Sequence, residues 1–116
     1  MTTFAILMRS DTYASTSIVD CHRFITAATQ LEHQIDHVFL YENAVLAALA
    51  QPDLPSDEMD LAGELAKLCS SLNIPLLYCS TAAEKRGILQ PRDGYTLAGL
   101  AEFGMRLAAV DKLIQF

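Results

Sequence analysis

The stretch Ile74-Pro-Leu-Leu-Tyr-Cys79, followed by Ser80-Thr-Ala-Ala-Glu-Lys-Arg-Gly87, decides the fold of this chain. Residues 74–78 form an apolar run without polar alternation, which predicts a strand buried on both faces of a sheet. The Thr-Ala-Ala-Glu segment that follows has the spacing of a capping box, which predicts a short helix that ends near Gly87. The stretch therefore predicts a buried strand that passes directly into a helix, with Cys79 at the junction.

Apolar patterns on both sides of this stretch predict that strands alternate with helices. Short continuous apolar runs predict buried strands, and apolar residues that recur every three or four positions predict helices with one buried stripe. The predicted strands are Phe4–Met8, Ile35–Tyr41, Ile74–Tyr78 and Lys112–Phe116, and the predicted helices are Ala14–Leu31, Ala44–Ala50, Leu61–Leu72, Thr81–Gly87 and Leu97–Ala108. This alternation predicts a small three-layer α/β domain, flavodoxin-like, with a mostly parallel sheet and helices on both faces.

Two details of the predicted helix 61–72 can be tested by the structure. Ser56 precedes it and is placed to cap its first turn. Leu61, Leu65, Leu68 and Leu72 mark its predicted buried face.

Ligands of parallel α/β sheets bind beyond the carboxyl ends of the strands, near a topological switch point. In this chain those ends are the segments Arg9–Tyr13, Glu42–Asn43 and Cys79–Thr81. The sequence therefore predicts the functional site at this edge of the sheet.

Length and charge restrict the class of protein. A chain of 116 residues has the size of one domain, which we expect to span residues 1–116. Its net charge of −6 argues against a direct nucleic-acid binder and against docking on anionic membranes. No apolar run reaches the ~20 residues that cross a bilayer, and Arg9 follows the first apolar stretch, the reverse of a signal peptide. We therefore expect a cytoplasmic protein.

The three cysteines are the candidate chemistry. Their odd number, without a CxxC pair, predicts neither a disulfide framework nor a structural zinc site. Cys79 stands where a strand meets a helix N-terminus, which stabilises a thiolate, and Lys85 and Arg86 add positive potential. The alternative is that Cys79 only fills space, as free cysteines commonly do. Cys21 and Cys69 lie on the apolar stripes of predicted helices and are expected to be core residues.

Other polar residues give weaker signals. His22 lies beside a buried stripe, whereas His33 and His37 flank the start of a strand and are expected to be solvated turn residues. Ser10, Asp11 and Tyr13 either end the first strand as a polar loop or line a pocket beside Cys79. The chain has no G-x-G-x-x-G motif, no P-loop and no G-x-S-x-G elbow, so a nucleotide- or flavin-binding domain is the less supported alternative.

Ordered blocks over nearly the whole chain carry a family resemblance. Residues 55–61, 73–79, 82–88, 95–100 and 110–116 resemble the DsrE-like sulfur-relay family, and its TusD members above all. The segment between residues 88 and 94 is shorter than in typical TusD members. In this family the cysteine after the third strand accepts sulfane sulfur from a donor protein as a persulfide and passes it on. The position that matches it is Cys79.

The resemblance also implies partners. It implies sulfur donor and acceptor proteins, and a homo-oligomer or a hetero-hexamer with TusB-like and TusC-like subunits. It implies a role in tRNA 2-thiouridine modification or in sulfur oxidation, and the persulfide chemistry requires no metal or organic cofactor. The alternative function is a non-catalytic assembly subunit of such an oligomer, in which Cys79 is a packing residue.

Overall fold

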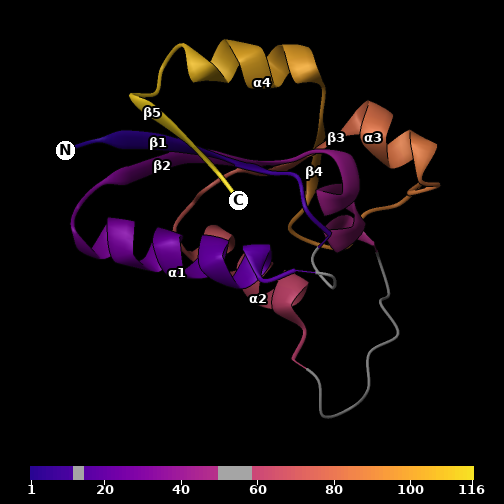
Figure 1. The fold of residues 1–116 in the computed structure, drawn as a ribbon, viewed down its shortest axis with the longest axis horizontal. Helices are drawn as coiled ribbons and strands as arrows, with labels where there is room; N and C mark the ends of the chain where they lie inside the picture. Colours follow the sequence, from indigo (N-terminus) through magenta and orange to yellow (C-terminus); the bar gives the residue numbers. More distant parts are fainter. Residues whose placement is uncertain (12–14, 50–58) are drawn as a thin grey trace.

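The computed structural model describes residues 1–11, 15–49 and 59–116 and places five parallel strands in one sheet (Figure 1). The order across the sheet is β4-β3-β2-β1-β5. The strands are β1 (Thr3–Met8), β2 (Gln34–Leu40), β3 (Leu76–Cys79), β4 (Thr96–Ala98) and β5 (Lys112–Gln115). The predicted α/β class with a mostly parallel sheet is confirmed.

The helices cover both faces of the sheet, as the direction of each crossover requires. The chain moves from β1 to β4 in one direction, and right-handed crossovers place α1 and α2 on the same face. It then returns to β5 beside β1, so α4 lies on the opposite face (Figure 1). The helices are α1 (Ser17–Gln30), the 3₁₀ helix η1 (Glu42–Ala48), α2 (Leu61–Ser71), α3 (Ser80–Lys85) and α4 (Leu100–Leu107).

The prediction for residues 97–108 is wrong in part. The helix begins only at Leu100, and the preceding residues 96–98 form β4, which pairs with residues 77–79 of β3. Gly94 makes this path possible: it has a positive φ of 92°, and a Cβ there would lie 2.9 Å from the Cβ of Ala66 in α2. Tyr95 then turns into the core, where its hydroxyl donates a 2.7 Å hydrogen bond to the carbonyl oxygen of Ala62.

Helix α2 has a different cap and a different buried face from those predicted. Asp60 caps it, because its carboxylate accepts a hydrogen bond from the Gly63 N–H at 3.2 Å. Ser56 lies outside the described residues. The buried residues of α2 are Ala62, Leu65 and Cys69, whereas Leu72 is 39% exposed and Leu61 and Leu68 are half-buried.

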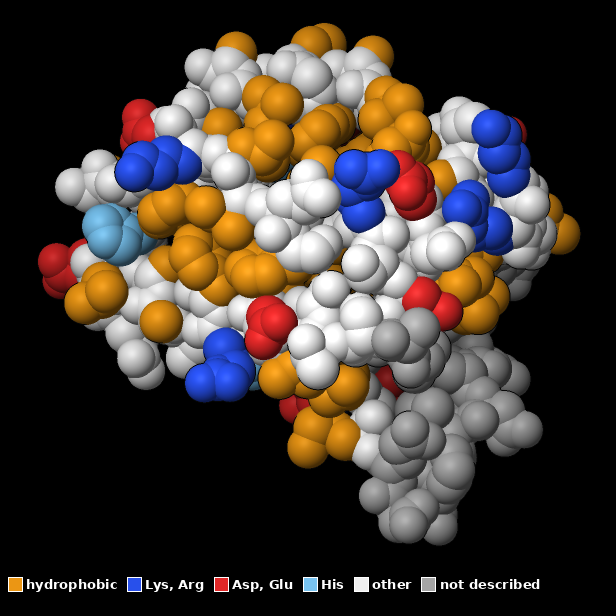
Figure 2. All heavy atoms as spheres, in the orientation of Figure 1, with side chains coloured by type: hydrophobic (Ala, Val, Ile, Leu, Met, Phe, Trp, Pro, Cys, Tyr) orange, Lys and Arg blue, Asp and Glu red, His pale blue; other side chains and the backbone are white. Residues whose placement is uncertain are grey.

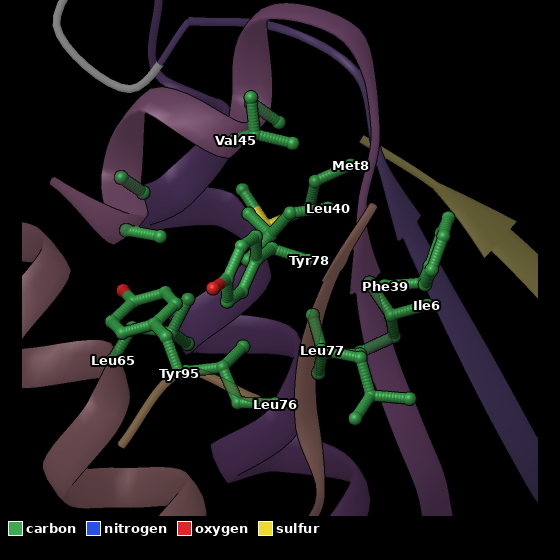
Figure 3. Close-up of a cluster of buried hydrophobic side chains, with 14 of the residues drawn as sticks. Ile6, Met8, Phe39, Leu40, Val45, Leu65, Leu76, Leu77, Tyr78 and Tyr95 are labelled. Carbon is green, nitrogen blue, oxygen red and sulfur yellow. The ribbon is translucent and has the colours of Figure 1, made fainter. Parts of the chain in front are cut away.

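The main core lies between the sheet and the α1–α2 layer. Met8, Leu40 and Tyr78 occupy one register across three strands and point into the same cluster, which Figure 3 shows. Leu65 of α2 and Tyr95 belong to the same cluster. All five are nearly or fully buried, so apolar burial on this side is the chief source of stability.

His37 is not the solvated turn residue that the sequence predicts. It lies inside β2 and its side chain is fully buried. The register between β1 and β2 shifts at this point, so that Asp36 is an extra residue, a β-bulge. The bulge brings Asp36 Oδ2 within 2.7 Å of His37 Nδ1, and Phe103 of α4 packs edge-on against the ring.

No helix within residues 1–11, 15–49 and 59–116 is both long enough and apolar enough to cross a membrane.

Candidate functional site

Cys79 is the last residue of β3 and the N-cap of α3. Its backbone is extended, with φ −69° and ψ 125°, and the next residue begins the helix. The predicted capping box is wrong, since Thr81 lies inside α3 and the N-cap residue is Cys79, whose side chain makes no capping hydrogen bond. The helix does end as predicted: Gly87 has a positive φ of 72°, and Gly87 and Ile88 donate hydrogen bonds to the carbonyls of Glu84 and Ala83.

The carboxyl ends of β1, β2 and β3 meet at one edge, as the sequence predicts. Arg9 follows β1, and its Nε donates a 2.9 Å hydrogen bond to Glu42 after β2. Asn43 accepts two hydrogen bonds at its Oδ1 from Arg86 at the end of α3, at 3.1 and 2.9 Å. These contacts bring the segments that begin at Arg9, Glu42 and Cys79 together.

A cavity of about 210 Å³ opens between these segments. It lies beside the junction that holds Cys79, because Thr81 and Ala82 belong to its wall. The residues that line it are Tyr41, Glu42, Thr81, Ala82, Lys85, Arg86 and Leu100. Cys79 itself is only 1% exposed and is not among the residues that line the cavity.

This edge lies away from the topological switch point. The strand order reverses between β1 and β5, whereas the cavity lies near the ends of β2 and β3. The switch point therefore does not mark the cavity, and the placement of the functional site at the carboxyl edge stays a prediction.

Cys21 and Cys69 are core residues, as predicted. Both are buried, one in α1 and the other in α2. Burial raises the pKa of the Cys21 thiol far above its usual range, and the neighbouring Cys69 raises it further. Burial raises the pKa of Cys69 to about 12. Neither thiol therefore supplies a useful amount of thiolate near neutral pH.

None of the three histidines joins this edge. His33 accepts a 3.0 Å hydrogen bond from the Thr2 N–H and packs edge-on against Phe4, at the start of β2. His37 lies in the same half of β2, and His22 of α1 lines a separate apolar cavity of about 280 Å³ with Met59 and Leu61. The structure therefore assigns no histidine as a base for Cys79.

The loop after β1 is only partly described. The Asp11 carbonyl accepts a 3.1 Å hydrogen bond from the Ser15 hydroxyl, which joins this loop to the start of α1. Tyr13 lies outside the described residues. Within residues 1–11, 15–49 and 59–116, no three His, Cys, Asp or Glu side chains gather as metal ligands would.

Comparisons with known proteins identify the family. The model of the DsrE/DsrF-like family matches residues 2–116. The chain belongs to the DsrE/DsrF-like family. Sulfurtransferase TusD of Proteus mirabilis is 27% identical over 98% of both chains, and the TusD homolog of Haemophilus influenzae is 24% identical over 96% of this chain and 97% of its own. The crystal structure of the YchN protein from Escherichia coli superposes with a TM-score of 0.84 at 26% identity and covers all of both chains.

The sequence did not predict every residue of the site. Tyr41 and Leu100 line the cavity, yet they lie in a predicted strand and a predicted helix, whereas Asn43 belongs to a strand end where the sequence predicts the site. Asn43 and Arg86 are 43 residues apart, so only the tertiary fold brings them together. The sequence predicted the position of Asn43 at the edge but not its contact with Arg86.

Proposed function

We propose that this protein accepts sulfane sulfur as a persulfide on Cys79 and passes it to a partner protein. The single observation that carries the proposal is the position of this thiol. Cys79 ends β3 at the carboxyl edge beside a cavity lined by Lys85 and Arg86, whereas the other two thiols lie in the core. The chain is similar over nearly its whole length to proteins named sulfurtransferase TusD, and this similarity supports the same role.

The transfer is balanced without an added oxidant or reductant. The Cys79 thiolate attacks the outer sulfur of the donor persulfide, and a new S–S bond forms to Sγ. The S–S bond of the donor breaks, and its electron pair leaves with the inner sulfur as a thiolate. The next transfer repeats this exchange toward the acceptor, so no metal or organic cofactor takes part in the proposed steps.

Access to the sulfur requires a local movement. The Cys79 side chain is 1% exposed, while Thr81 beside it is exposed. Helix α3 has only six residues and lies at the edge of the sheet. A local opening of such a short element requires far less free energy than global unfolding and exposes the thiol to a partner.

The proposal includes an oligomer. Helix α4 has no buried residue, and its Leu100 and Met105 are 48% and 76% exposed. Figure 2 shows hydrophobic side chains gathered over α4 and along its contact with the sheet. A second subunit on this face would bury them, either a copy of this chain or a TusB-like or TusC-like subunit, as in the hexamers that the family resemblance implies.

The wider context follows from the same proposal. Donor and acceptor are proteins, and the relay serves tRNA 2-thiouridine modification or sulfur oxidation in the cytoplasm. Residues 1–116 act as one DsrE-like domain in this proposal.

Sulfur loading tests the proposal directly. The protein is incubated with a cysteine desulfurase, cysteine and a relay donor, and the intact mass is measured. We expect a gain of one sulfur atom in the wild type and in Cys21→Ala and Cys69→Ala, and no gain in Cys79→Ser. Unchanged loading of Cys79→Ser would contradict the proposal.

The near-complete burial of Cys79 favours a second candidate, a non-catalytic assembly subunit. Alkylation of the folded protein separates the two functions. Modification of Cys79 by iodoacetamide while Cys21 and Cys69 resist supports the carrier. Equal protection of all three thiols supports the assembly subunit.

A further inference from the structure

The wall of the cavity beside Cys79 carries two cations that pair with no carboxylate of the described residues, in a chain with a net charge of −6. Among the described residues that line it, Glu42 is the acidic one, and it pairs with Arg9. The two cations of the wall, Lys85 and Arg86, have no carboxylate partner within the described part of the chain. Figure 2 shows Lys and Arg side chains gathered over α3.

The two cations are held differently. Arg86 is fixed: its Nε and Nη2 donate to Asn43 Oδ1, and its Nη1 donates to the Ala82 carbonyl oxygen at 3.0 Å. Lys85 is exposed, and its ammonium group has no hydrogen-bond or ion-pair partner in residues 1–11, 15–49 and 59–116. A flexible, unpaired ammonium group is free to follow an incoming anion.

We propose that Lys85 is a positioning residue that draws the anionic outer sulfur of the donor persulfide into this cavity. The inference rests on the proposed function of Cys79. A persulfide is ionised near neutral pH, and the form of Cys79 that attacks it is the thiolate anion, so two like charges approach each other. Positive charge at the cavity wall reduces this repulsion and also stabilises the Cys79 persulfide anion that forms. Arg86 supplies a fixed charge, and Lys85 supplies one that moves with the ligand.

The expected effect is one of rate rather than of stability. Lys85 is exposed and makes no side-chain hydrogen bond or ion pair within the described residues that its removal would break. A single exposed charge near a reacting anion changes association by roughly three- to tenfold at low salt, and the effect falls as salt screens it.

Alkylation by reagents of different charge tests the inference without any partner protein. Iodoacetate is an anion and iodoacetamide is neutral, so the ratio of their rates at Cys79 measures attraction of anions to the cavity. We expect Lys85→Met to lower this ratio roughly three- to tenfold at low salt, and Lys85→Arg to keep it. Lys67→Met is the matched control: Lys67 is an exposed lysine of α2 that pairs with Glu64 and does not line this cavity, and its loss changes the net charge equally.

Sulfur transfer provides the second measurement. The initial rate of loading from the donor persulfide should fall roughly three- to tenfold in Lys85→Met at low salt, converge with the wild type at high salt, and stay unchanged in Lys67→Met. Equal alkylation ratios and equal loading rates in Lys85→Met and Lys67→Met would overturn the inference. So would a Cys79 that reacts with neither reagent in the folded protein. If Cys79→Ser still loads sulfur, the proposed function fails, and the alkylation ratio still decides whether the cavity attracts anions.

Discussion

Two buried regions of this molecule hold a cysteine in similar packing and differ in what surrounds it. Cys69 lies between α2 and the sheet, and Cys79 lies at the carboxyl edge, each with 1% of its surface exposed. The surroundings of Cys69 are apolar, and burial raises its pKa to about 12. Cys79 adjoins exposed Thr81 and a cavity with two cations. Burial alone therefore does not separate a structural thiol from a candidate nucleophile; the neighbouring elements and the charges that they carry do.

The largest expected effect on stability lies in the α1–α2 core. Leu65 is fully buried in the cluster between α2 and the sheet. Leu65→Ala should lower the free energy of unfolding by about 2–5 kcal/mol, because it removes apolar contacts and leaves a cavity. Urea unfolding followed by circular dichroism measures this loss. Sulfur loading per folded molecule should stay unchanged, and a specific loss of loading would show that the two regions are coupled.

Tyr95 joins the two regions, because it is anchored under α2 and leads into β4, the strand that pairs with β3. Tyr95→Phe removes its hydrogen bond to the Ala62 carbonyl and should cost about 1 kcal/mol. The same unfolding measurement checks this value. Tyr95→Phe should also increase the rate of alkylation at Cys79 more than at Cys69, because β4 pairs with the end of β3 that carries Cys79. Equal acceleration at both thiols would mean that the change acts globally.

Acid should weaken the α2 side through Asp60. A side-chain hydrogen bond from Arg92, and with it a backbone bond from Gly63, holds the pKa of Asp60 below its usual value. A carboxyl group whose pKa is lower in the folded state than in the unfolded state stabilises the fold at pH values above its pKa in the unfolded state, about 3.9. This stabilisation is lost as the pH falls from there through the pKa of the folded state. Asp60→Asn should therefore cost at most about 1 kcal/mol at pH 7 and nothing below the folded pKa. Unfolding curves at pH 7 and pH 2.5 test the difference; a constant difference would contradict the assignment.

The smallest expected effect on stability lies at the carboxyl edge. Asn43 is exposed and holds Arg86, so Asn43→Ala should change the free energy of unfolding by about 0.5–1 kcal/mol at most. Its effect on the alkylation ratio of Cys79 should be visible nonetheless, because the fixed cation loses its anchor. A large loss of stability would instead make this edge a structural element like the α1–α2 core.

The sequence predicted the elements that local pattern controls. β1 and β3 are short apolar runs, and α1 has one apolar stripe, so each can be recognised without distant residues. β2 and β5 mix apolar and polar residues, but their apolar residues are still close together in the sequence. It failed where an alternative local structure fits the same residues. β4 has only three residues, and the apolar spacing that begins within them is also typical of a helix. Its pairing with β3 is what makes this segment a strand.

His37 shows a second kind of failure. A polar residue near the start of a strand is usually solvated, yet the bulge at Asp36 shifts the register and turns the ring under Phe103. Its Nδ1 has Asp36 as a partner, whereas its Nε2 is buried without one in the described residues. Nothing in the order of the residues reveals a register shift, because it depends on the neighbouring strand.

The order of amino acids by itself determined the α/β class, the junction at Cys79 and the core placement of Cys21 and Cys69. These depend on the spacing of apolar residues and on the residues adjacent in the sequence, which are local properties. Only the tertiary structure decided that Asn43 fixes Arg86, that Arg9 pairs with Glu42 and that Lys85, in the cavity wall, has no ion-pair partner among the described residues. Those facts depend on segments more than thirty residues apart meeting at one edge of the sheet. Whether a charged side chain at this edge has a partner depends on distances between side chains in space, and the sequence does not contain these distances.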